Sequence, residues 1–102
     1  MIHYGLVDRR TGEMVDVRLG TAAARGELHE RTVRGEDVLV QPVMLRSDYA
    51  RMPSDYRSEK EGVPYLLYMG MNGGTTYGPV ILLDNWGKWS EMEHHRPLES
   101  VG

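Results

Sequence analysis

Apolar residues alternate with polar ones or glycine in two segments near the start of the chain. They occupy every second position of residues 2–6 and again of residues 15–19. This alternation is typical of strands that bury one face and leave the other in water. Residues 8–12, Asp-Arg-Arg-Thr-Gly, lie between the two segments and are rich in turn formers. The pattern predicts an antiparallel hairpin over residues 2–19.

A second hairpin is predicted over residues 63–83. Two apolar runs, 63–71 and 77–83, flank the sequence Asn72-Gly73-Gly74-Thr75-Thr76. Asn-Gly supplies the positive φ angles that tight hairpin turns require. Both faces of each run are largely apolar, so we expect central strands that are covered on both sides. Pro79 lacks an N–H, which places its side of the second strand at an edge or a bulge.

A helix is predicted over residues 22–34, with Thr21 as its N-cap and Gly35 as its stop. Its i,i+4 ion pairs would be Glu27 with Arg31 and Glu30 with Arg34. Gly26 weakens this prediction because glycine costs helix stability. After the helix, residues 38–45 predict a further strand, broken or at a sheet edge because of Pro42.

The order of these elements predicts an α+β fold with a mostly antiparallel sheet of about five strands, two hairpins among them, and one helix packed on it. A small β-barrel is the alternative, favoured if the alanine-rich segment is a loop. The 102 residues fit a single domain. Residues 46–62 would form a long loop of the kind that is usually functional or disordered, in which Ser47 and Ser54 could each cap a short helical turn. Residues 96–102 would form a frayed tail.

Composition narrows the function classes. The formal charge is −3, with fifteen acidic against twelve basic residues, which disfavours non-specific binding of nucleic acid. No cysteine is present, which excludes disulfides and thiolate chemistry and fits a reducing compartment. No apolar run approaches the ~20 residues of a membrane span, so no membrane partner is expected. We therefore expect a cytoplasmic protein, in the host cytoplasm if a phage encodes it.

The segment from Arg46 to Arg57 has the composition of a recognition surface. Ser-Asp-Tyr occurs twice in it, among three arginines and a methionine. Tyr, Arg and Met often supply much of the binding energy of an interface, although chance recurrence of turn formers would give the same repeat. Two nearby tryptophans, one expected to be buried and one partly exposed, extend the candidate surface. The candidate partner-binding residues are Arg46, Asp48, Tyr49, Arg51, Met52, Asp55, Tyr56, Arg57, Trp86 and Trp89.

Three patterns suggest chemistry, and none predicts a metal or cofactor site. Residues 91–95, Glu-Met-Glu-His-His, match no zinc signature. His3 and His29, with Glu27 or Glu30, would form an acid–base pair only if the fold brings them together. The glycine-rich segment 70–76 resembles a phosphate cradle, but it lacks the lysine and the following helix of a P-loop, so a hairpin turn explains it better.

Three hypotheses about function remain. The first is a non-catalytic protein-binding domain, an inhibitor or an assembly subunit, with an accessory protein of a phage or mobile element as one conceivable setting. The second is a nucleic-acid binder that uses arginines on phosphates and aromatic side chains on bases. The third is a small hydrolase or nuclease that uses His29, Glu27, His94 or His95. The strand edges near Pro42 and Pro79 would also allow a homodimer.

Overall fold

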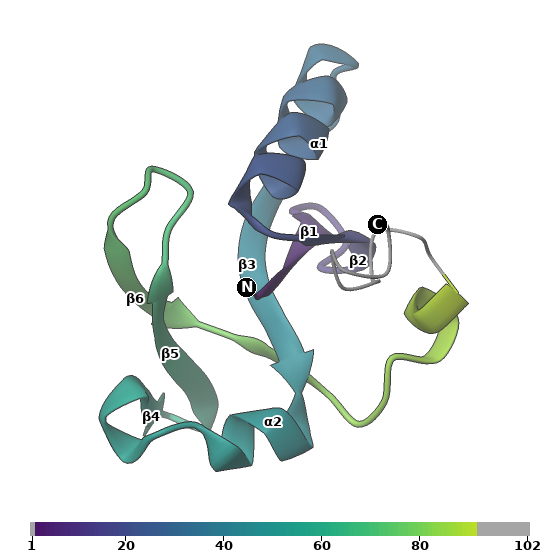
Figure 1. The fold of residues 1–102 in the computed structure, drawn as a ribbon. Helices are drawn as coiled ribbons and strands as arrows, with labels where there is room; N and C mark the ends of the chain where they lie inside the picture. The colour runs from purple at the N-terminus through teal and green to yellow at the C-terminus, as the bar shows by residue number, and fades with distance from the viewer. Residues whose placement is uncertain (1, 92–102) are drawn as a thin grey trace, which may run out of the picture.

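A computed structural model describes residues 2–91 of the chain (Figure 1). In chain order the elements are β1 (His3–Asp8), β2 (Met14–Leu19), α1 (Thr21–Val33), β3 (Val38–Leu45), α2 (Arg46–Arg51), the 3-10 helix η1 (Ser54–Tyr56), β4 (Arg57–Lys60), β5 (Val63–Met69), β6 (Thr75–Pro79), β7 (Ile81–Leu83) and the 3-10 helix η2 (Gly87–Glu91). The predicted tail 96–102 and the histidines at 94 and 95 lie outside this range.

The predicted α+β fold is confirmed, and the strands form two sheets with no closed barrel. The first sheet has the strand order β2-β1-β3-β7, and the second has the order β4-β5-β6. All pairings are antiparallel except that of β3 with β7, which is parallel. The described residues contain seven strands, compared with about five predicted from the sequence.

The predicted strand over 77–83 is two strands that belong to different sheets. β6 ends at Pro79 in the second sheet, and β7 begins at Ile81 beside Val43 in the first. Between them the Val80 N–H still donates to the Pro64 carbonyl at 3.0 Å. Pro79 is the last residue of an edge strand, as expected, because a proline cannot donate to a ladder.

The segment 46–62 contains α2, η1 and β4, where the sequence predicted a loop. Strand β4 was missed because Arg-Ser-Glu-Lys has no apolar alternation. It pairs with β5 across a two-residue turn in which Glu61 and Gly62 both have positive φ, 50° and 81°. Such a turn matches the twist of a hairpin.

Two apolar clusters lie on opposite faces of the first sheet. Val43 belongs to one cluster and Met44 to the other, and neighbouring strand residues point to opposite faces. The Met44 cluster joins the first sheet to β5 through Leu66 and Val80. On the same face as Met44, α1 buries Ala24. β5 is the central strand of the second sheet, as expected, but its two terminal residues, Val63 and Met69, are 43% and 53% exposed.

The helix α1 was predicted nearly in full. It begins one residue earlier than expected, since Gly20 occupies the N-cap position and Thr21 is helical. Its end is a Schellman motif. Gly35, with φ 87°, donates to Thr32 at 3.0 Å, and the Glu36 N–H donates to Arg31 at 3.0 Å.

The turn between β5 and β6 differs from the predicted one. The Gly70 N–H donates to the Gly74 carbonyl at 2.7 Å, and the Gly73 N–H donates to Gly70 at 3.0 Å. Gly73 alone adopts positive φ in this loop, at 88°, which is the three-residue hairpin type. Asn72 contributes its side-chain oxygen, which accepts from the Gly74 N–H at 3.0 Å.

Candidate functional site

An apolar cleft of about 620 Å³ opens between the start of α1, strand β1 and strand β5. Its size is within the range of about 300–1,000 Å³ that is usual for ligand pockets. We call it the apolar cleft. It is lined by Ile2, Tyr4, Leu19, Gly20, Thr21, Ala22, Ala23, Met52, Tyr56, Leu66, Leu67, Tyr68 and Met69. No charged side chain is among them.

Two of the tyrosines that line the apolar cleft, Tyr4 and Tyr68, lie close to each other. Tyr4 is 1% exposed, and its hydroxyl donates to the Met69 carbonyl at 2.5 Å. The rings of Tyr4 and Tyr68 lie 6.3 Å apart in a tilted arrangement. Burial raises the pKa of Tyr4, with a further contribution from Tyr68, and burial also raises the pKa of Tyr68. Both phenols are therefore neutral donors, not candidate bases.

Met52 and Tyr56 bring the predicted recognition segment into the wall of the apolar cleft. Met52 caps the C-terminus of α2, and Tyr56 ends η1, so the Pro53 turn between these short helices places both side chains against β5. Tyr56 is 46% exposed, so part of its ring is accessible to a partner. These two residues are the members of the predicted set that line the cleft.

Tyr49 and Arg57 hold the segment in place. The Tyr49 hydroxyl lies 2.8 Å from the Tyr65 carbonyl and 3.0 Å from the Ser58 carbonyl, on neighbouring strands. Arg57 lies over the Tyr49 ring, 5.9 Å from its centre, and donates to the Met52 carbonyl at 2.9 Å. Tyr49 thus links α2 to the second sheet, and its ring is half-buried.

Three of the four remaining charged residues of the candidate set are paired with a charge of opposite sign. Arg46 pairs with Asp84 at 3.1 Å, and Arg51 pairs with Asp48. Asp55 is exposed in η1. Because acidic and basic side chains alternate here, the segment does not form a basic patch of the kind that attracts phosphates.

The tryptophans lie on the other face of the first sheet from the Met44 cluster. Trp89 is 9% exposed and packs with Val17 and Val43. Trp86 is half-buried, and its ring centre lies 4.5 Å from that of His3. The expected pairing of one buried and one partly exposed tryptophan is therefore found. The structure does not place either of them at the apolar cleft.

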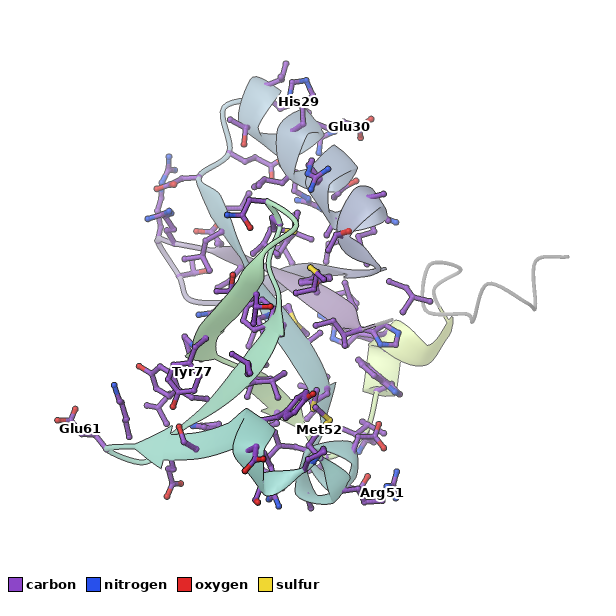
Figure 2. The ribbon with its side chains drawn as sticks, turned by 60° about the vertical axis from the view of Figure 1, so that its left-hand side comes forward. His29, Glu30, Arg51, Met52, Glu61 and Tyr77 are labelled. Atoms are coloured by element: carbon purple, nitrogen blue, oxygen red, sulfur yellow. The ribbon has the colours of Figure 1, made fainter. Side chains whose placement is uncertain are left out.

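Of the candidate acid–base groups, His29 and Glu30 line an open hollow at the end of α1 with Val33 and Arg34, whereas Glu27 is already paired. His29 and Glu30 lie on the exposed side of α1, far from Arg51 and Met52 at the opposite end of the molecule (Figure 2). Glu27 accepts from Arg18 and Arg31, each at 2.9 Å. Within residues 2–91 no group of three or more His, Asp or Glu side chains is arranged to hold a metal ion.

None of the helices in the described part of the chain is long and apolar enough to cross a membrane.

Sequence reasoning did not find the apolar cleft as a site. Tyr4 and Tyr68 looked like ordinary strand residues, and Thr21 to Ala23 like a helix start. These residues come from β1, α1 and β5 and meet only after folding, so no local sequence pattern indicates the cleft.

Comparison with protein-family models, with curated proteins and with solved structures gives no match for this chain.

Proposed function

We propose that this protein is a non-catalytic protein-binding domain that takes an apolar side chain of its partner into the apolar cleft. The observation that carries the proposal is the position of Met52 and Tyr56, two exposed or half-buried side chains of the recognition segment, in the wall of that cleft. Tyr and Met at the rim of an apolar pocket have the composition of a binding hot spot.

The organisation of the walls supports binding without large rearrangement. Tyr4 donates to the Met69 carbonyl, and Tyr49 joins α2 to β4 and β5, so hydrogen bonds connect the elements that carry the walls of the cleft. A preformed pocket lowers the entropy cost of binding. With no charged side chain in its lining, the cleft would select an apolar group and reject a charged one, which would lose its hydration there.

The other two hypotheses gain less support. For a nucleic-acid binder, the arginines would have to converge, whereas Arg9 lies 3.3 Å from Asp37 and Arg46 lies 3.1 Å from Asp84. For a hydrolase, a base would have to lie in a cleft. The lining of the apolar cleft contains none, and the hollow that His29 and Glu30 line is formed by exposed positions at the end of a single helix.

The test is quantitative capture by the tagged full-length protein, from lysate of the source organism and of any host, before and after nuclease treatment. Tyr56→Ala should reduce the amount of a nuclease-resistant partner by at least about tenfold, since anchor residues contribute about 2 kcal/mol or more. Val63→Ala is the control, because Val63 is 43% exposed, lies outside the cleft and does not belong to β6. Equal capture by wild type and Tyr56→Ala would contradict the proposal, as would capture that disappears with nuclease.

A further inference from the structure

Strand β6 forms an open edge of the second sheet. Its one strand partner in the described residues is β5 (Figure 1). An open edge presents unpaired N–H and C=O groups and is a template for another strand. The opposite edge, β4, carries the charges of Arg57, Glu59 and Lys60, which discourage such pairing, whereas β6 has none.

The alternation of hydrogen-bonded and non-hydrogen-bonded pairs along the ladder shows which backbone groups of β6 point away from β5. The Val80 N–H donates to the Pro64 carbonyl, and the Gly70 N–H donates to the Gly74 carbonyl. These two residue pairs, one just beyond each end of the ladder, are therefore hydrogen-bonded pairs. In an antiparallel ladder bonded and non-bonded pairs alternate. The register then makes Leu66 with Gly78 and Tyr68 with Thr76 bonded pairs.

Thr75, Tyr77 and Pro79 are therefore in the non-bonded pairs, and their backbone groups point away from β5. Pro79 lies at one of these outward positions, so its missing N–H costs no hydrogen bond to β5. The free edge offers two N–H donors and three carbonyl acceptors. The side chains of Thr75 and Tyr77 are exposed as well.

This edge is complementary to itself in one antiparallel register. If two copies of β6 meet with Thr76 at the twofold axis, Thr75 pairs with the second copy's Tyr77, and the two residues exchange both N–H···O bonds. Symmetry repeats the exchange, which uses all four N–H donors and leaves both Pro79 residues outside the bonded core. Thr beside Tyr and Thr beside Thr are favourable cross-strand neighbours.

We propose that β6 pairs with β6 of a second copy of this chain, in the register centred on Thr76, and joins the two three-stranded sheets into one. The interface is isologous and closed, as in most homodimers. A five-residue edge is small, so association is weak and concentration-dependent. This inference is independent of the apolar cleft, which β6 does not line.

The test is sedimentation equilibrium of the full chain from about 10 µM to about 1 mM, the range suited to weak interfaces. Wild type should shift from monomer to dimer. Thr75→Pro removes one outward donor per copy and should raise the dimer dissociation constant at least about tenfold. Thr75→Ala, which keeps the N–H, should dimerise nearly as wild type does. A wild-type monomer throughout, or a dimer unaffected by Thr75→Pro, would overturn the proposal.

Hydrogen exchange of the wild type tests the same register without any substitution. The amides of Thr75 and Tyr77 should exchange more slowly as protein concentration rises, while those of Thr76 and Gly78 should not change, because they already bond to β5. Fast exchange of Thr75 and Tyr77 at every concentration would reject self-pairing and leave the edge to a strand of another protein. Partner capture by Tyr56→Ala does not measure self-association. Binding at the apolar cleft and self-pairing of β6 can therefore each be rejected while the other stands.

Discussion

At the scale of single residues, the two tyrosines of the repeated Ser-Asp-Tyr unit have different roles. The Tyr49 hydroxyl reaches backbone carbonyls of β4 and β5, and its ring is half-buried beneath Arg57. Tyr56 is 46% exposed at the cleft. The repeat therefore does not mark two equivalent anchors. Removing both residues together would combine a loss of stability with a loss of binding.

We expect Tyr49→Phe to lower the free energy of unfolding by about 1–2 kcal/mol, because the carbonyls of Ser58 and Tyr65 lose a donor. Tyr56→Phe, the matched change at the exposed tyrosine, should change the free energy of unfolding by less than about 0.5 kcal/mol. Urea denaturation of both variants measures the difference. Equal effects would mean that Tyr49 does not hold α2 against the second sheet.

At the scale of elements, α1 is fixed to β2 by ion pairs that are largely withdrawn from water. Arg18 of β2 contacts Glu27 of α1 at 2.9 Å, and Arg31 of α1 contacts Asp16 of β2 at 3.7 Å and Glu27 at 2.9 Å. Burial alone would raise the pKa of Glu27, but hydrogen bonds and charges from Arg18 and Arg31 lower it below its usual value of 4.5.

Replacing Glu27 with Gln should destabilise the protein by about 1–2 kcal/mol at pH 7, because two half-buried arginines lose a charged partner. Since folding lowers the pKa of Glu27, its stabilising contribution is complete above pH 4.5 and disappears as the pH falls through the folded-state value. The difference between wild type and Glu27→Gln in thermal unfolding should therefore shrink in acid. Glu30→Gln, at an exposed position of the same helix, should change little at either pH.

The elements that the sequence predicted well are those with a local signal. Alternation predicted the first hairpin, and Gly35 marked the end of α1. Strand β4 had no such signal, because Arg-Ser-Glu-Lys is an exposed edge with little apolar surface. The break between β6 and β7 was hidden as well, since Val80 is apolar and 5% exposed, like a residue inside a continuous strand.

At the scale of the whole molecule, the proposed binding mode predicts weak dependence on salt. An apolar group in an uncharged cleft releases no counterions, so affinity for the partner should change less than about threefold between about 50 and 200 mM salt. Phosphate contacts would instead reduce affinity by roughly a thousandfold or more over that range. Titration of the captured partner at both salt concentrations distinguishes these cases, and a steep loss would favour the nucleic-acid hypothesis.

The candidate site could be predicted from sequence only in part, for a reason that concerns the whole molecule. Met52 and Tyr56 were in the predicted set because their composition is that of interfaces. Trp86 and Trp89 were in it because they are close to the second hairpin in sequence, and β7 carries them to the other side of the first sheet. Proximity along the chain did not become proximity in space.

The parallel pairing of β3 with β7 makes everything between them a crossover connection. The chain leaves the first sheet after Leu45 and returns at Ile81, which is the register partner of Val43. Exit and re-entry are thus neighbours, as in a module inserted into a host sheet. The edge strand β6 and the residues Met52 and Tyr56 belong to this inserted module. Exposed residues of this inserted module can therefore be substituted without changing the strand order of the first sheet.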